Sequence, residues 1–345
     1  MFNLRRLGYM AASLVIIVML LYLLGLISCG TPGAEKEEAV NGNEKETEVQ
    51  AELLYRTEGW DEIHSLAFSP DGEVIAVGAR EVELYSVVKG EVIRSGDEGD
   101  RPESNSLSFS PGGSILAAAW RGAGLYHAEN LFRLQHLHGG NECRVAFSPD
   151  GKTLASHPNQ MHGEIWLWQT ENGRDFEKVA EFDPDGDMIQ AIEFTPDGAY
   201  VAGGFRDGKV RFWEVGTHEP AYTIDFDSSG GNYNLTFSPD GKILAASEPD
   251  LGRKIYLFDL EDGTKKRVLD PEGRVSRMQF SADGTRIAYG KFDGTVEILD
   301  TQDWSLLYSL DHDDAISGLS FSPNGENLAV GTGAGVLYYY HIAEP

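Results

Sequence analysis

The chain has 345 residues, with 28 Lys and Arg against 55 Asp and Glu, and therefore a formal net charge of −27 at pH 7. A chain this acidic repels nucleic acid and anionic lipid headgroups, and it lacks the basic stripe that would neutralise a phosphate backbone. The composition thus excludes nucleic acid as a partner class.

Residues 1–28 have the pattern of an export signal. Arg5 and Arg6 precede a charge-free apolar run that continues to a small-residue break at Ser28. The run is also long enough to cross a bilayer as a helix with the two arginines on the cytoplasmic side. An uncleaved anchor helix is therefore the alternative to a cleaved signal peptide.

The letters LISC at Leu26 to Cys29 resemble the lipobox of bacterial lipoproteins at all four positions. The resemblance implies that residues 1–28 are a lipoprotein signal peptide and that Cys29, as the first mature residue, is acylated. Two or three acyl chains hold a protein stably on a membrane. We therefore expect an extracytoplasmic bacterial protein, lipid-anchored to the cell membrane or, where the host has one, to the outer membrane.

Residues 29–51 are expected to form an acylated cysteine followed by a disordered acidic tether. Residues 30–51 contain six glutamates, two lysines and almost no side chain that could enter a core. Cys143 is the only cysteine besides Cys29, so no disulfide can form within the mature chain. Stability must then come from packing.

Seven copies of one short motif recur after the tether. The sequence AFSPDG stands at 67–72 and again at 146–151, with near copies at 108–113, 193–198, 236–241, 279–284 and 320–325. The phenylalanines of successive copies are 41, 38, 47, 43, 43 and 41 residues apart. This period indicates a repeat architecture rather than two ordinary domains.

The motif has the chemistry of a tight turn between two strands. Ser, Pro, Asp and Gly occupy the turn positions that favour each of them, and short apolar stretches lie on both sides. A third strand in each unit ends in a large apolar residue, and these residues are Tyr85, Tyr126, Trp168, Trp213, Phe258, Leu299 and Tyr340. A fourth strand completes each unit, and the repeated phenylalanine is expected to lie in the core between units.

These units resemble the WD-repeat family from Leu53 to Ile342, although Trp-Asp itself is absent and Trp168-Gln169 and Trp213-Glu214 are among the nearest forms. The family's histidine before the phenylalanine occurs only as His138 and His312, and its turn aspartate clearly only as Asp207 and Asp293, so its buried polar network is expected to be mostly missing. The resemblance implies an all-β fold for residues 52–345. That fold is a seven-bladed β-propeller of four-stranded antiparallel blades, in a divergent bacterial member.

The chain order predicts how the propeller closes. The letters LLY at 53–55 place Tyr55 13 residues before Phe68, just as LLY at 306–308 places Tyr308 13 residues before Phe321. We therefore expect the N-terminal strand to supply the outer strand of the last blade, which hides an otherwise unpaired edge.

Partner binding is expected at the upper end of the propeller, where the first strands begin. In the WD-repeat family the residues four and six positions before each phenylalanine surround the upper mouth of the channel. The corresponding residues here are His64, Asn105, Cys143, Gln190, Tyr233, Ser276 and Ser317, with Glu62, Glu103, Asn141, Met188, Gly231, Arg274 and Ala315 above them. Neighbouring hairpins add Trp120, Arg121, Arg206 and Phe292. The residues predicted to contact a partner are His64, Asn105, Trp120, Arg121, Gln190, Arg206, Tyr233, Arg274 and Phe292.

This mixture of polar, aromatic and basic residues favours docking over chemistry, because Trp and Arg dominate binding energy at interfaces. The prediction is a non-catalytic, monomeric scaffold that binds a protein or peptide and needs no cofactor. The alternative is a lactonase-like or quinoprotein-like enzyme with its site in the channel. Two segments offer metal-binding groups, the hairpin at 157–164 for a soft metal and the turn at 183–187 for Ca²⁺, but solvated turns explain both more simply.

Overall fold

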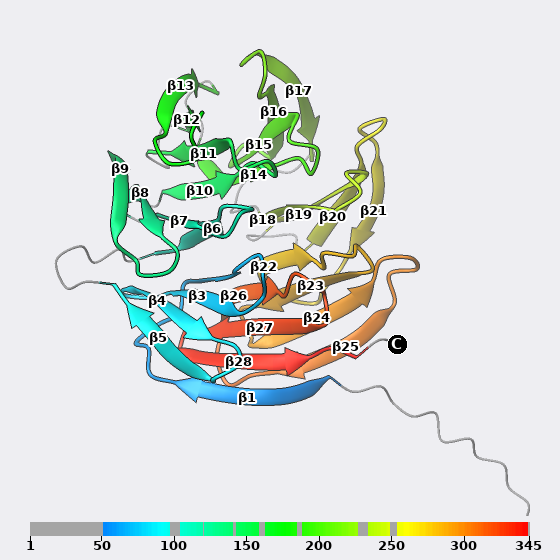
Figure 1. The fold of residues 1–345 in the computed structure, drawn as a ribbon. Helices are drawn as coiled ribbons and strands as arrows, with labels where there is room; N and C mark the ends of the chain where they lie inside the picture. Colours follow the sequence, from blue (N-terminus) through cyan, green and yellow to red (C-terminus); the bar gives the residue numbers. More distant parts are fainter. Residues whose placement is uncertain are drawn as a thin grey trace, which may run out of the picture. The chain divides into compact units, whose positions relative to one another are not determined.

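The computed structural model describes residues 51–96, 104–119, 121–140, 143–158, 163–184, 188–226, 234–248 and 254–343. These residues form seven four-stranded antiparallel sheets and contain no helix (Figure 1). The predicted all-β, seven-bladed propeller is confirmed. Cys29 and the segment before it lie outside the described residues.

Each blade is one sheet, and in blades 1 to 6 the strands follow one another in chain order. The first strands of blades 1 to 7 are β2 (Ser65–Phe68), β6 (Ser106–Phe109), β10 (Arg144–Phe147), β14 (Ile189–Phe194), β18 (Asn234–Phe237), β22 (Val275–Phe280) and β26 (Ile316–Phe321). The second strands are β3 (Val74–Gly78), β7 (Ile115–Ala119), β11 (Thr153–His157), β15 (Tyr200–Phe205), β19 (Ile243–Glu248), β23 (Arg286–Lys291) and β27 (Asn327–Thr332). The third strands are β4 (Val82–Ser86), β8 (Gly122–His127), β12 (Ile165–Gln169), β16 (Lys209–Glu214), β20 (Lys254–Asp259), β24 (Thr295–Asp300) and β28 (Val336–His341). The outer strands of blades 1 to 6 are β5 (Glu91–Ser95), β9 (Arg133–Gly139), β13 (Glu177–Phe182), β17 (Pro220–Asp225), β21 (Lys265–Leu269) and β25 (Leu306–Asp311), and blade 7 takes β1 (Glu52–Glu58).

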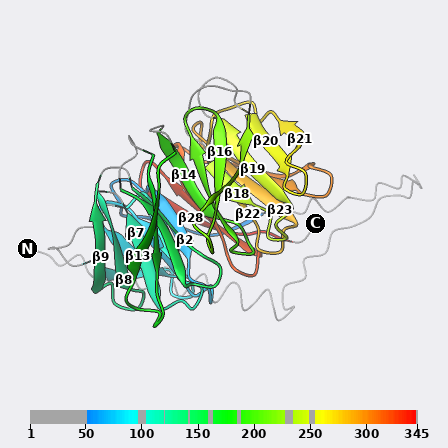
Figure 2. The ribbon, with the colours of Figure 1, turned by 90° about the horizontal axis from the view of Figure 1, so that it is seen from above.

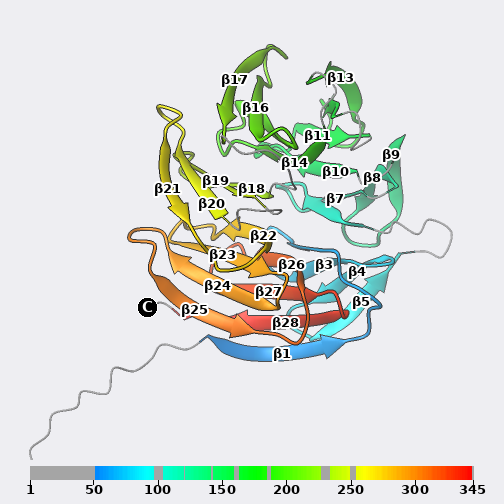
Figure 3. The same cartoon turned by 180° about the vertical axis from the view of Figure 1, so that it is seen from behind.

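The first strands form the inner ring of the propeller. Each contacts the first strand of the next blade, and β26 contacts β2, so that the ring is closed (Figure 3). Figure 2 shows the same blades from above. The inner edge of every first strand therefore faces a central channel, and side chains from adjacent blades must satisfy that edge.

The N-terminal strand closes blade 7, as predicted. β1 pairs antiparallel with β28, from Glu52 opposite His341 to Glu58 opposite Val336. The Tyr55 ring stacks on Tyr339 at a centroid distance of 4.7 Å, whereas Leu53 and Leu54 are each 46% exposed. The closing strand is thus held by backbone pairing and by Tyr55 rather than by its two leucines.

The seven repeated turns have one geometry. In each, the glycine N–H donates to the carbonyl of the first residue, as from Gly72 to Ser69 at 2.9 Å. The Ser or Thr hydroxyl also accepts the N–H five residues on, as from Val74 to Ser69 Oγ at 3.0 Å. The glycines have φ between 70° and 74°, a left-handed conformation that glycine adopts without steric cost.

The large apolar residues of the third strands are all less than 9% exposed, and four of the seven repeated phenylalanines are at most 6% exposed. One part of the WD-type polar network is also present. His138 Nε2 lies 2.9 Å from Ser156 Oγ, which accepts a 2.9 Å hydrogen bond from Trp168 Nε1. Since His138 lies on β9 and the other two residues lie in blade 3, this network joins two blades.

Candidate functional site

The upper end of the propeller gathers the starts of the first strands and the hairpins between the second and third strands. Antiparallel pairing forces this arrangement, because Ile189 lies opposite Phe205 and Val275 opposite Lys291. The residues predicted from the two kinds of segment therefore lie at one end of the molecule, as the sequence analysis assumed.

Four of the predicted binding residues project into solvent at this end. Arg121, Arg206 and Arg274 are exposed, and Phe292 is 49% exposed. The Arg274 guanidinium lies over the Phe292 ring at 4.6 Å, and Arg206 Nη1 lies 3.3 Å from Met188 Sδ. Blades 4 and 6 thus each present an arginine, one paired with an aromatic ring and the other with a thioether.

Three other predicted residues lie deeper. His64 is partly buried, with Nδ1 3.7 Å from Glu62 Oε1, and Asn105 has a buried Oδ1 with no hydrogen-bond partner among the described residues. Gln190 is only 5% exposed, so it offers a partner little surface. The last two predicted residues, Trp120 and Tyr233, lie outside the described residues.

Two arginines on the channel side of this end, Arg144 and Arg277, were not among the predicted binding residues. Arg144 Nη1 donates to the Asn105 carbonyl at 3.0 Å, and Arg277 Nη2 donates to the His64 carbonyl at 2.7 Å. Each guanidinium therefore links its own blade to the start of another first strand. Both arginines lie three residues before the repeated phenylalanine, directly after the position four residues before it, but the sequence pattern does not show that their side chains reach other blades.

The positive charge of Arg144 also acts on the pKa of Arg277. Burial and, to a smaller extent, the positive charge of Arg144 together lower the pKa of Arg277 to about 10. Both side chains therefore contribute positive potential inside the channel, although their hydrogen bonds to carbonyl groups give them a structural role at the same time.

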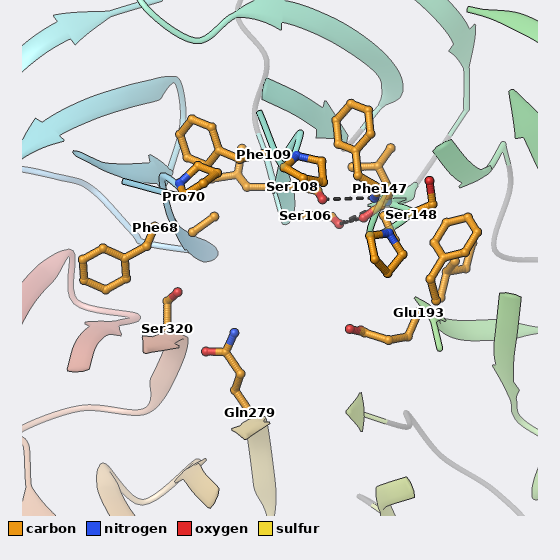
Figure 4. A pocket seen from close by; sticks show the side chains of 18 of the residues that line it. Phe68, Pro70, Ser106, Ser108, Phe109, Phe147, Ser148, Glu193, Gln279 and Ser320 are labelled. Atoms are coloured by element: carbon orange, nitrogen blue, oxygen red, sulfur yellow. Dashed lines mark hydrogen bonds between the residues drawn. The ribbon is translucent and has the colours of Figure 1, made fainter. Parts of the chain in front are cut away.

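The lower half of the channel is a cavity of about 560 Å³. Its wall consists of first-strand residues and of the turn prolines Pro70, Pro111, Pro149, Pro196 and Pro323. Figure 4 shows Glu193 and Gln279 pointing into this space, with Ser106 and Ser108 on the wall. Ser106 and Ser108 accept the N–H groups of Val145 and Phe147 at 3.1 Å each, and Gln279 Oε1 accepts that of Phe321 at 2.8 Å.

Among the described residues that line this wall, Glu193 is the only acidic one. Its side chain reaches the cavity but is surrounded by protein, and burial raises the pKa of its carboxyl to about 8. Among the described residues, no side chain forms a hydrogen bond or ion pair with this carboxyl. The group can therefore accept a proton near neutral pH or bind a cation that enters the channel.

The segments considered for metals give no support for a site. Within the described part of the chain, no three His, Cys, Asp or Glu side chains lie together in a way that could hold a metal ion. His157 is fully buried, and neither ring nitrogen has a hydrogen-bond partner among the described residues. Residues 159–162 and 185–187, which complete the two candidate segments, lie outside the described residues. Cys143 is buried, which raises the pKa of its thiol to about 11.

Comparison with known proteins agrees with this architecture. The model of the family "WD domain, G-beta repeat" matches residues 51–81, 176–214 and 304–340. The chain is 32% identical over 121 residues to the small ribosomal subunit protein RACK1z of rice, which covers 33% of this chain and 35% of that protein. It is 28% identical over 155 residues to the WD repeat-containing protein SL1-17 of Schistosoma mansoni, covering 45% and 49%.

A third relative is the eukaryotic translation initiation factor 3 subunit I of Pyricularia oryzae, 24% identical over 177 residues, which covers 48% of this chain and 50% of the relative. The chain thus spans half or less of the length of these relatives. All three come from eukaryotes, so they do not test the predicted bacterial origin. The chain contains WD40 repeats within a seven-bladed propeller and is similar, over part of its length, to WD-repeat proteins.

Proposed function

We propose that this propeller binds a protein or peptide partner at its upper end and has no catalytic activity of its own. The observation that carries the proposal is the exposed Arg274–Phe292 pair of blade 6, together with the exposed Arg206 on the upper hairpin of blade 4. A planar guanidinium held against an aromatic ring loses little freedom on binding, and such side chains supply most of the affinity of protein interfaces.

The names of two relatives support a role in protein assemblies. One is called a ribosomal subunit protein and another a subunit of a translation initiation factor, and each name denotes one component of a larger complex. We therefore propose that the partner of this chain is also a polypeptide.

The channel favours binding over catalysis. An enzyme in the channel would need several converging carboxylates or metal ligands. Glu193 instead faces serine, alanine and glutamine side chains across the described cavity wall. A single carboxyl group in such surroundings is not enough for acid–base or metal chemistry.

Site-specific photo-cross-linking tests the docking face. A photoreactive amino acid in place of Phe292 is expected to cross-link a discrete partner in intact cells, and the same amino acid in place of the exposed Glu73, beside the lower-end turn of blade 1, is not. Combining Arg206→Ala with Arg274→Ala should remove the cross-link without changing the melting temperature. Cross-linking from position 73 alone would place the binding face at the opposite end.

We further propose that the propeller is monomeric and is tethered outside the cytoplasm through a lipid on Cys29. The support is the Leu26–Cys29 motif and the acidic segment that follows it. Among the residues described by the structure, no helix is long and apolar enough to span a membrane. A tether of about 20 flexible residues has a typical end-to-end distance of about 25 Å, which would let the upper end face a partner in several orientations.

A further inference from the structure

The lower end of the propeller carries the seven repeated turns, and the glycine of each turn stands close to the turn of the preceding blade. A Cβ atom placed on Gly151 would lie 3.0 Å from Cδ of Pro111, and one on Gly198 would lie 3.5 Å from Cδ of Pro149. Similar contacts involve Gly72, Gly113, Gly284 and Gly325. Gly241 in blade 5 is the exception, because a Cβ there would meet no described atom within 4 Å, although Pro196 occupies the preceding turn.

The same junction is also incomplete on its channel side. At the junctions between blades 2 and 3 and between blades 6 and 7, Ser108 and Gln279 accept the N–H of the next blade's repeated phenylalanine. Glu193 occupies the equivalent position in blade 4, but no hydrogen bond joins it to Phe237 in blade 5, both of which the structure describes. Among the described residues, the junction between blades 4 and 5 thus lacks the close turn contact that the other junctions have, and it lacks the hydrogen bond, as do the junctions that begin at Ala67 and Ala146.

A cavity of about 380 Å³ lies at this place, and we call it the blade 4–5 pocket. Its lining residues include Pro196, Asp197, Tyr200, Tyr222, Pro239 and Asp240. The Tyr222 ring stacks on Phe212 at 4.2 Å and meets the edge of Tyr200 at 5.6 Å. Since stacking uses one face of the Tyr222 ring and the residue is 39% exposed, an aromatic surface is open to a ligand.

Two carboxylates complete the pocket. Oδ1 of Asp197 accepts hydrogen bonds from the Thr195 hydroxyl at 2.6 Å and the Ala199 N–H at 3.0 Å, and Asp240 is held in the same way. These bonds lower the pKa of both carboxyls, so both are ionised at neutral pH. Lys242 approaches Oδ2 of Asp240 at 3.5 Å, but its side chain is 74% exposed and can move away.

We propose that the blade 4–5 pocket binds the side chain of an arginine from a partner polypeptide. Ionised carboxylates beside exposed tyrosine rings suit a guanidinium, which can stack on an aromatic face and donate to carboxylates in its own plane. A bare metal ion suits the pocket less well, because the described residues offer no cluster of three acidic or imidazole ligands there. This surface lies at the end of the propeller opposite the proposed docking face, so the two proposals are independent.

Fluorescence polarisation with a labelled peptide Gly-Ser-Arg-Ser-Gly tests the proposal on the purified mature protein. The matched peptide with citrulline has nearly the same shape but no charge, and a third peptide carries lysine. The arginine peptide should bind at least about tenfold more tightly than the citrulline peptide and more tightly than the lysine peptide, because only arginine combines planarity with charge.

The variants separate the pocket from the general acidity of the chain. The pocket pair Asp197→Asn with Asp240→Asn and the control pair Asp71→Asn with Asp150→Asn remove the same charge from equivalent turns. Both pairs should fold, because Asn324 already occupies this position in blade 7 and accepts the Ser322 hydroxyl at 2.6 Å. The pocket pair should weaken arginine-peptide binding about tenfold, Tyr222→Leu about fivefold, and the control pair less than twofold.

Three results would overturn the proposal. Equal losses in the two pairs would mean that the peptide senses only net charge. Equal affinity for the arginine and citrulline peptides would show that the guanidinium charge does not contribute to binding. Full affinity in the folded pocket pair and in the folded Tyr222→Leu variant would place the binding elsewhere.

Discussion

At the scale of single residues, this propeller differs most from a uniform repeat where a polar side chain enters the channel. Ser106, Ser108 and Gln279 use their oxygens to satisfy the inner edge of the next blade. Glu193 occupies the same kind of position, but no described side chain forms a hydrogen bond or ion pair with it, and its burial raises the pKa of its carboxyl to about 8. A buried group whose charged form is disfavoured lowers stability wherever the unfolded chain would ionise it.

Glu193→Gln is therefore expected to stabilise the protein in a pH-dependent way. The folded pKa lies above the unfolded value of about 4.5, so the cost begins above pH 4.5, grows until about pH 8 and is constant beyond. The variant should gain about 1 to 3 kcal/mol at pH 8 and almost nothing at pH 4. Urea unfolding of both proteins across this range provides the measurement, and a gain that does not change with pH would contradict the account.

Ser156 links the partial polar network, and its replacement should be costly. Ser156→Ala leaves the Trp168 Nε1–H without an acceptor and His138 without its 2.9 Å contact, in a position that is fully buried. We expect a loss of about 1 to 3 kcal/mol in the free energy of unfolding. In the double variant Ser156→Ala with Trp168→Phe, which has no indole N–H to satisfy, the cost of removing the serine hydroxyl should be smaller. Equal costs in the two backgrounds would show that the Trp168 bond contributes nothing.

At the scale of elements, strand β1 completes blade 7, the last blade of the ring. Its pairing with β28 covers the edge of blade 7, and Arg56 and Thr57 add hydrogen bonds to Tyr338 and Tyr85. Leu53 and Leu54 contribute little to the stability of this pairing, since both side chains are nearly half exposed. The contribution of β1 depends on covering a backbone edge that would otherwise pair with another chain.

Deleting residues 52–58 should therefore unfold or aggregate the protein. The deletion exposes the length of β28 and removes the Tyr55 stack on Tyr339, a loss that is large beside the total stability of about 5 to 15 kcal/mol expected for a domain. Calorimetry and light scattering would report the change. Deleting residues 35–49, a longer segment outside the propeller, is the control, and the closure model fails if both deletions leave the same melting temperature.

At the scale of the whole molecule, the propeller presents two ends of different character. The lower end repeats one turn seven times, whereas the upper end carries unequal hairpins with arginine and aromatic side chains. Repetition serves packing between blades, and variety serves recognition. The proposed attachment of the molecule to a membrane depends on Cys29, in the segment before the propeller.

Acylation at Cys29 is testable by metabolic labelling with a fatty-acid probe. The wild-type protein should be labelled and processed, and Cys29→Ala should be neither, because the thiol is the acceptor of the lipid. Cys143→Ala is the matched control, since its thiol is buried and should take no part. Label on Cys29→Ala equal to that on the wild type would exclude the lipoprotein signal.

The sequence by itself determined the number of blades, the position of their turns and the strand that closes the ring. Each of these follows from local chemistry, because Ser-Pro-Asp-Gly forms a turn wherever it occurs and the spacing of seven copies counts the units. The tertiary structure alone decided which side chains cross from one blade to another. Arg144 and Arg277 bond to carbonyl groups of other blades, and Gly241 stands apart from Pro196 although its turn reads like its neighbours. Those features depend on distances between blades, which are set by packing across the whole ring and leave no mark on the sequence of any single repeat.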